Sequence, residues 1–359
     1  MTYALYLLPF VALIFPFAAQ ADTAARDQAI ALDIGGFVRM YGSAVTQDDA
    51  TGHIAPFDLL RDTEIYFRGK TVLQNGVTIG MQIETDVDAD DNSSVNESYL
   101  YALGDWGRIN VGEEDGAAYL LQITTPGADP NIDGARTEIQ PFNDTAAGLG
   151  GGLSGTYNLG YGNDEAKDAH KITYLSPRFA GLQLGVSYAP ETDDGSVADV
   201  EGNRLTNSGL DDAYEAAMRY EGKLQDVKLT LGGGYTHIVN ASAGADDFQE
   251  WNTGLDVNLA GFGMGAVYTE NNGAANNADQ TTWVIGVDYA FDAFTLGGSY
   301  LHQRDKGDNS QAERYTAGIH HDYAPGVRFS GVAMHTQVDA DLDVQATGTA
   351  LLLGTQIDF

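Results

Sequence analysis

The chain has 359 residues, of which 51 are acidic and 18 basic, and its formal net charge is −33. This charge excludes a nucleic-acid-binding role, which needs a basic surface, and it favours cations as partners. Cysteine is absent, which excludes a disulfide framework, a thiolate metal site and a cysteine nucleophile. Glycine is abundant, with 44 residues, and no shift in composition divides the chain into domains.

The N-terminal segment has the pattern of an export signal. Residues 4–18 are largely apolar, and Ala19-Gln20-Ala21 has the small-x-small form of a cleavage site. We therefore predict a signal peptide over 1–21, cleaved after Ala21, and a mature protein over 22–359. Residues 1–3 carry no Lys or Arg, so either the start codon lies upstream or the terminal amine serves alone. An N-terminal membrane anchor is the alternative.

Sixteen short segments follow, and each alternates apolar with polar or small residues. This alternation is typical of half-buried strands. In the first segment Ile34 and Met40 share one face, while Arg39 and Tyr41 share the other. The polar face carries charge in many segments, so water covers it and lipid covers the apolar face. Closing sixteen strands into a barrel removes the sheet edges and leaves an aqueous bore.

The joints between these segments alternate between tight and long. This alternation describes an up-and-down meander with two unlike rims, which is how outer-membrane barrels are built. We predict an all-β fold, a sixteen-stranded antiparallel transmembrane β-barrel with short periplasmic turns and long extracellular loops. The tight joints lie at residues 73–77, 103–108, 178–182, 223–228, 259–263, 291–294 and 323–327.

The last segment alternates up to the final residue. Leu351, Leu353, Ile357 and Phe359 share one face, which predicts a lipid-facing strand that closes against the first. We interpret the terminal Phe359 as a C-terminal assembly signal.

The third long joint, residues 113–169, is far longer than an ordinary hairpin connection. Ten acidic residues against two basic ones give it a net charge of −8. It also contains the apolar residues Leu120, Leu121 and Ile123, which need a covering surface. We therefore predict that this third loop folds into the lumen and packs on the inner wall.

Several phrases of the chain, in their order and spacing, resemble one family. They are FVRMYG (37–42), EIYFRGK (64–70), LGDWGRINVGEEDGAA (103–118), KITYLSPRFAGLQLGVSYAP (171–190) and the terminal Phe359. The chain is similar to Gram-negative general diffusion porins, nearest the sixteen-stranded trimeric porins of alphaproteobacteria. The resemblance implies a homotrimer that passes small hydrophilic solutes passively. It also implies an eyelet in which acidic residues of the third loop face a basic cluster on the wall.

The residues suggest the two sides of such an eyelet. Arg39, Arg68 and Lys70 have inward parity near the middle of the first two strands, and two opposed charge rows would set up a transverse field. Alternatively, each arginine is a solvated lumen residue or pairs with Glu64 or Glu84, and the loop acids are plain loop charge. The Gly-rich stretch of the loop leaves its tip without a predicted path. The predicted pore-lining set is Arg39, Arg68, Lys70, Glu84, Glu113, Glu114, Asp115, Asp129, Asp133 and Glu138.

Two runs gather oxygen ligands of the kind that Ca²⁺ prefers. They are Glu113-Glu114-Asp115, the candidate Ca²⁺ ligands, and residues 86–92, and neither matches an EF-hand. Solvated charge is the alternative, and no other cofactor is expected.

An enzyme in a barrel is a rival function. His320 and His321 lie near an acid, but adjacent strand residues point to opposite faces, and no motif supplies a nucleophile. We therefore expect no enzymatic activity. The pattern is also compatible with a substrate-selective channel and with a plugged structural or adhesive barrel. The expected location is the outer membrane, reached through the periplasm, with outer-membrane lipid, lipopolysaccharide, small solutes and cations as partners, and weak cation selectivity.

Overall fold

The structure is a computed structural model, which describes most of the chain beyond residue 29. The described residues are 30–48, 54–87, 95–143, 159–192, 209–242, 244–274, 279–307, 309–340 and 344–359. The predicted signal peptide and its cleavage after Ala21 lie outside these residues, as does most of the acidic run 86–92.

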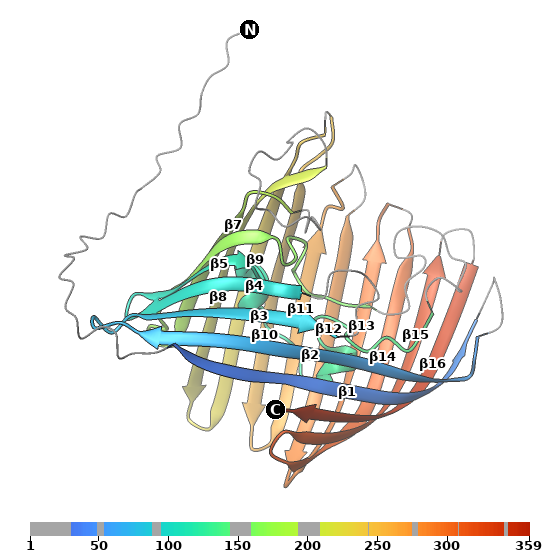
Figure 1. Cartoon of the computed structure of the whole chain (residues 1–359). Helices are drawn as coiled ribbons and strands as arrows, with labels where there is room; N and C mark the ends of the chain where they lie inside the picture. The colour runs from blue at the N-terminus through green and yellow to red at the C-terminus, as the bar shows by residue number, and fades with distance from the viewer. Residues whose placement is uncertain are drawn as a thin grey trace.

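Sixteen strands form one closed antiparallel barrel in which each strand pairs with its sequence neighbours (Figure 1). The first strand, β1 (Ala31–Gln47), closes the barrel against the last, β16 (Val344–Asp358). This confirms the predicted fold class. The others are β2 (Phe57–Val72), β3 (Thr78–Asp86), β4 (Val95–Gly104), β5 (Gly107–Glu113), β6 (His170–Leu175), β7 (Leu182–Ala189), β8 (Leu210–Leu224), β9 (Val227–Asn240), β10 (Phe248–Leu259), β11 (Phe262–Asn271), β12 (Gln280–Phe291), β13 (Phe294–Asp305), β14 (Gln311–Ala324) and β15 (Val327–Ala340).

The strand connections have the predicted alternation. All seven predicted tight joints connect consecutive strands, from β2–β3 to β14–β15, and they share one rim, the tight-turn rim. The longer connections share the opposite rim, the long-loop rim. At the closure, the Phe359 backbone exchanges two hydrogen bonds of 3.0 Å with Gly36. Its role as an assembly signal stays a prediction.

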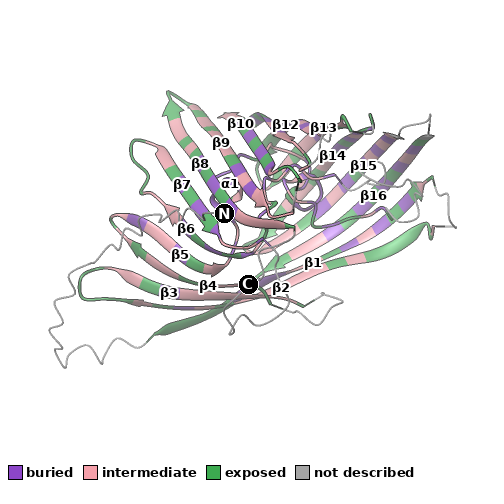
Figure 2. Cartoon of the chain, turned by 90° about the horizontal axis from the view of Figure 1, so that it is seen from above, coloured by how far each residue is buried: buried purple, intermediate pink, exposed green. Residues whose placement is uncertain are grey.

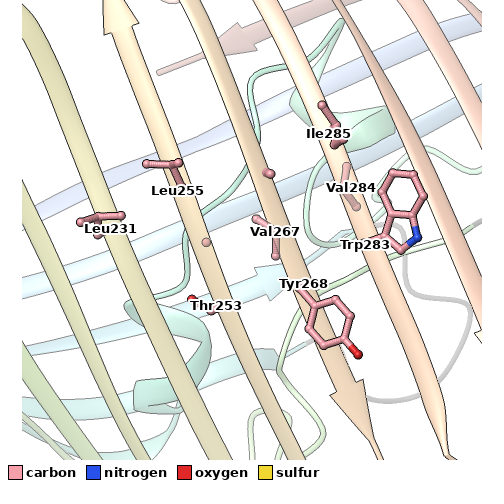
Figure 3. A pocket seen from close by; sticks show the side chains of 10 residues that line it. Leu231, Thr253, Leu255, Val267, Tyr268, Trp283, Val284 and Ile285 are labelled. Atoms are coloured by element: carbon pink, nitrogen blue, oxygen red, sulfur yellow. The ribbon is translucent and has the colours of Figure 1, made fainter.

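The predicted faces of the first and last strands are confirmed. Ile34 and Leu353 are exposed on the outer wall at 62% and 76%, whereas Tyr41 on the inward face is 2% exposed. Between β9 and β12 the outer wall has a shallow apolar groove of about 380 Å³, flanked by Leu255 and Trp283 (Figure 3).

Two rows of aromatic contacts run over the outer wall, separated by aliphatic residues. Rings with one polar and one apolar end prefer the two interfaces of a bilayer. The row towards the long-loop rim includes Trp251, Tyr268, Trp283, Tyr300 and Tyr315, and the row at the tight-turn rim includes Phe262, Tyr289, Phe291, Phe294 and Phe329. Among the described residues, neither helix is long enough to cross a membrane.

The third loop lies inside the barrel over its described parts, 113–143 and 159–169. It carries two short helices, α1 (Ala117–Leu120) and α2 (Pro130–Asp133). Helix α1 contacts β6, β7, β8 and β9 and lies within the ring of strands when the barrel is seen from above (Figure 2). Asp129 is the N-cap of α2, and its side chain accepts a hydrogen bond from the Asn131 N–H at 3.1 Å.

Glycines on the inner wall make room for this close approach. At several inward positions of the described wall, including the seven named below, a Cβ atom would meet the third loop at or inside van der Waals distance. At Gly286 and Gly297 the obstructing atoms are backbone carbonyl oxygens, of Pro126 and Gly127. We call this set the glycine track: Gly185, Gly234, Gly254, Gly265, Gly286, Gly297 and Gly318.

The inner wall under the loop includes a large apolar cluster beside its buried polar residues. Val267, Val284, Leu301, Met334 and Leu352 point inward and are at most 4% exposed. They form one cluster with the loop residues Ile123, Ile132, Ile139 and Leu159. Sequence alternation alone predicts water on this face, whereas the described part of the loop covers it.

Candidate pore constriction

The uncovered inner wall is built by β1–β5. Strand alternation points every second residue of these strands into the lumen. The inward side chains that carry charge or aromatic rings include Asp33, Phe37 and Arg39 of β1, Asp62, Glu64, Tyr66, Arg68 and Lys70 of β2, Glu84 of β3, Glu97, Tyr99 and Tyr101 of β4, and Arg108 of β5.

The two predicted wall arginines are held flat against the wall. The Arg39 guanidinium donates to the Asp62 carboxylate at 2.7 Å and stacks on the Phe37 ring at 3.6 Å. The Arg68 Nε donates to Gln82 at 3.2 Å, and its guanidinium lies 4.7 Å from the Tyr66 ring. A charge fixed by stacking and pairing is a rigid part of the pore wall.

Lys70 lies elsewhere than expected. It pairs in register with Ala31 and Gly80, two residues before the end of β2, and is exposed at the tight-turn rim. The prediction placed it near mid-strand from the inward parity that it shares with Arg68, although the predicted tight joint at 73–77 begins only three residues later.

Acidic residues also line the wall. Glu84 belongs to the predicted pore-lining set, whereas Glu97 does not. Glu84 lies beside Glu97 in the β3–β4 register, and Gln82 donates a hydrogen bond to it. Glu64 accepts a hydrogen bond of 2.9 Å from the Tyr66 hydroxyl. The wall therefore presents carboxylates between its arginines.

The third loop presents a similar mixture from the other side. The Arg136 guanidinium pairs with Asp115 and, at 2.5 Å, with Asp164, and it stacks on Tyr119 at 3.8 Å. Glu138 has Asp62 and Arg39 of the wall among its electrostatic neighbours. Glu138 is thus the predicted loop acid that faces the wall arginine.

Wall and loop together enclose a polar cavity of about 530 Å³ in the lumen. Six acidic residues and three basic residues line it, so its charge is negative overall. The lining consists of Arg61, Asp62, Glu64, Asp86, Asn96, Arg136, Glu138, Asp164, Lys167 and Asp168.

Asp129 and Asp133, predicted at the eyelet, are buried behind the loop instead. Asp129 is completely buried and accepts a hydrogen bond of 2.8 Å from Tyr41. Asp133 is 3% exposed and accepts bonds from Ser299 at 3.1 Å and Thr316 at 2.6 Å. Both carboxylates anchor α2 to the wall, because a buried carboxylate needs donors that only the wall and backbone supply.

The predicted Glu113-Glu114-Asp115 set is divided among three environments. Glu113 has the outward parity of Val111 and lies 3.3 Å from His170. Glu114 is 4% exposed and accepts a hydrogen bond from Asn110. Of the three, Asp115 joins a carboxylate group within the described residues, formed with Glu97 and Asp168, whose oxygens lie within 4.8 Å of one another. Whether Ca²⁺ binds stays a prediction.

Burial raises the pKa values of two loop carboxyls towards neutrality. Desolvation, together with the neighbouring Asp115 carboxylate, raises the pKa of Asp168 to about 6. Desolvation likewise raises the pKa of Glu114 to about 7, against the opposing effect of Asn110 and Arg108. Both groups therefore change charge near neutral pH.

The histidine pair of β14 agrees with the sequence argument. His320 points inward, with Nδ1 3.4 Å from the Ala128 carbonyl oxygen, and His321 stacks on Phe294 outside. The two imidazoles cannot act on one substrate.

A sixteen-stranded barrel with an apolar outer band and a charged, loop-narrowed lumen defines a channel-forming membrane protein. The model of the family described as Gram-negative porin matches residues 10–341. The chain therefore belongs to the Gram-negative porin family, whose members are channel proteins.

Solved porins share the fold. An anion-selective porin from Comamonas acidovorans has a TM-score of 0.66 at 16% identity, covering 92% of this chain and 100% of that one. A mutant of the Rh. blastica porin has a TM-score of 0.57 at 17% identity, with the same coverage of both chains.

The curated relatives are distant. An uncharacterized protein of Rickettsia conorii is 23% identical over 55% of this chain and 56% of its own length. A chitoporin of Vibrio furnissii is 25% identical over 63% of this chain and 56% of its own length. The chain thus spans about half the length of these relatives.

Proposed function

We propose that the chain forms a water-filled channel of the outer membrane for passive diffusion of small hydrophilic solutes and ions, with weak cation selectivity. The observation that carries the proposal is the charge of the constriction. Carboxylates line both of its sides; Arg39 is paired with Asp62, and Arg136 is paired with both Asp115 and Asp164. The local potential of a pore sets the ion population that enters it.

The sign of the selectivity is a property of the lumen and not of the fold. The Comamonas acidovorans porin is anion-selective, yet it shares this fold at 16% identity. In this chain twice as many acidic as basic residues line the lumen cavity, and this excess opposes anion entry. The long loops would face the cell exterior, and the tight turns the periplasm.

Reversal potentials of the purified protein in planar bilayers test the proposal. In a gradient of dilute KCl we expect open channels that prefer K⁺. The preference should fade near 1 M salt, where the screening length falls to ~3 Å. Anion preference would contradict the proposed selectivity, and no conductance at all would contradict the channel.

The cation preference is expected to fall as the pH is lowered from 8 to 5. A carboxyl is ionised above its pKa, and the pKa values of Asp168 and Glu114 are raised to about 6 and about 7. These groups therefore lose their negative charges between pH 8 and pH 5, well above the usual carboxyl range near ~4. Reversal potentials recorded across this range measure the effect. A change confined to pH values below 4.5 would contradict it.

A homotrimer embedded in outer-membrane lipid and lipopolysaccharide is the proposed assembly. Its support is the outer surface around the barrel closure, which is aliphatic rather than aromatic. Leu32, Ile34, Leu351 and Leu353 are each at least 60% exposed there. We expect a native mass of three barrels in mild detergent. A mass near that of one 38.2 kDa chain would refute the trimer.

A substrate-selective channel is the second candidate. It is favoured by the similarity to the Vibrio furnissii chitoporin and by aromatic rings in the lumen, where Arg108 lies 4.5 Å from the Tyr101 ring. Flat rings beside hydrogen-bonding groups suit sugars. Concentration-dependent interruption of the ion current by a chito-oligosaccharide would favour this candidate, and uninterrupted current would favour general diffusion.

A further inference from the structure

One arginine lies outside the lumen, buried between the third loop and the barrel wall. Arg314 of β14 is fully buried and is among the largest fully buried side chains. Its Nη1 donates to the carbonyl oxygens of Leu159 and, at 3.4 Å, of Ile132, and it lies 3.4 Å from the Thr137 hydroxyl.

These three partners belong to both described limbs of the third loop. Ile132 and Thr137 lie on the limb that enters the barrel, and Leu159 lies on the limb that returns to β6. The Thr137 hydroxyl itself donates to the Leu159 carbonyl oxygen at 2.9 Å. A single guanidinium thus joins the two limbs to each other and to β14.

The surroundings of Arg314 separate it from the permeating ions. Its register neighbours, Leu301 of β13 and Thr336 of β15, are also fully buried. Asp133 is its acidic electrostatic neighbour, and that carboxylate is held by Thr316 at 2.6 Å and by the Ala128 N–H at 2.8 Å. A charge buried at this depth is costly unless it is paired and hydrogen-bonded.

We propose that Arg314 is the positioning residue that sets the exclusion limit of the pore. This inference rests on the proposed diffusion channel, and it identifies the side chain that fixes the width of that channel. Without the guanidinium, the carbonyl groups of Ile132 and Leu159 lose a shared donor, and Asp133 loses a nearby positive charge. The limbs then separate from β14, and Arg136 and Glu138, which lie on the same limb, retreat from the opposite wall.

The first test compares Arg314→Met with Arg314→Lys. Methionine fills a similar volume without donors, so we expect single-channel conductance to rise about twofold, because pore diameter controls passage. Liposomes containing this variant should also admit larger uncharged sugars than the unmodified protein does. Lysine keeps one charged donor and should give an intermediate width. Heat-modifiable migration on gels confirms that each barrel is folded.

The second test restores the attachment covalently. A Cβ at Gly318 would lie 3.2 Å from the Ala128 Cβ, a little inside the roughly 3.5–4.5 Å usual for a disulfide, and 2.6 Å from the Gly331 carbonyl oxygen, so the backbone must shift slightly to form the bond. The chain has no cysteine, so Ala128→Cys with Gly318→Cys can form one defined bond. In the Arg314→Met background, the oxidised pair should return conductance and exclusion limit towards those of the unmodified channel. Reduction with dithiothreitol should widen the pore again.

A matched pair controls for the effect of any tether. Ala117→Cys with Gly185→Cys joins α1 to β7, where the Cβ atoms would be 3.1 Å apart. This bond fixes the start of the loop and leaves the limb at Ile132 free, so the wide pore should persist. If the role of Arg314 were merely structural, Arg314→Met would lower the stability of both cysteine-pair variants. The two oxidised variants would then have the same pore width.

Folded Arg314→Met channels with unchanged conductance and exclusion limit would overturn the inference. If Arg314→Met does not fold, Arg314→Lys is measured with and without the 128–318 disulfide. An unaltered pore width in both of these forms would also overturn the inference. If the unmodified protein shows no channel activity, that separate result refutes the proposed function itself.

Discussion

Replacing Gly286 by alanine is expected to displace the third loop from the inner wall and enlarge the conducting pore. The added Cβ would fall far inside van der Waals contact with the Pro126 carbonyl oxygen. A backbone carbonyl cannot rotate away as a flexible side chain can, so the loop itself must move. Overpacking of this kind costs about 1–3 kcal/mol. Single-channel conductance should rise about 1.5-fold.

The control is another glycine in the same barrel. Gly331→Ala places its Cβ 3.5 Å from the nearest atom, Leu353 Cδ2, which is ordinary contact. It should leave conductance and thermal unfolding unchanged. Gly297→Ala, opposed by the Gly127 carbonyl oxygen, should repeat the effect of Gly286→Ala. Equal conductance of all three variants would show that the glycine track does not position the loop.

Removing the wall carboxylates is expected to have the largest effect on selectivity. The triple variant Glu64→Gln, Glu84→Gln and Glu97→Gln keeps side-chain size and takes away three carboxylates on adjacent strands. Two unit charges 4 Å apart interact by roughly 1 kcal/mol even in bulk water, and more beside a protein wall. Cation preference in dilute salt should therefore fall to neutrality or reverse, as measured by reversal potentials.

Removing the wall arginines should act in the opposite direction. Arg39→Ala with Arg68→Ala leaves Asp62 and Asp33 without those partners, so cation preference should increase and the pore should widen. Asp86→Asn serves as a comparison, since one acid at the end of β3 should have a smaller effect than the triple variant. If neither the triple glutamate variant nor the double arginine variant changed the reversal potential, the selectivity would arise outside this constriction.

Neutralising Asp129 and Asp133 is expected to act through loop position rather than through lumen charge. Both side chains are buried against Tyr41, Ser299 and Thr316, so their amides would weaken the attachment of α2. Neutralising Glu138, which neighbours Arg39, should change selectivity with less effect on width. From the sequence alone, Asp129, Asp133 and Glu138 all receive the same predicted role at the eyelet, because they lie in one acidic loop.

The sequence by itself determined the barrel. Alternation with a period of two requires one wet and one dry face, and the Gly/Asn/Asp joints mark where each strand ends. Together they predict the strand number, the order of pairing and the inward parity of Arg39 and Arg68. These features depend on local patterns, which any window of the chain contains.

Only the tertiary structure decided where the third loop runs and which charges it meets. Arg314, Glu64 and Arg136 carry no distinguishing local signal, because their roles come from residues that are distant in the chain. The glycine track consists of inward glycines on β7 and on β9 to β14, but their role depends on the loop that packs against them. Burial of Asp129 and exposure of Glu138 to the lumen likewise follow from the fold of the loop, since sequence gives charge but not the surface that covers it.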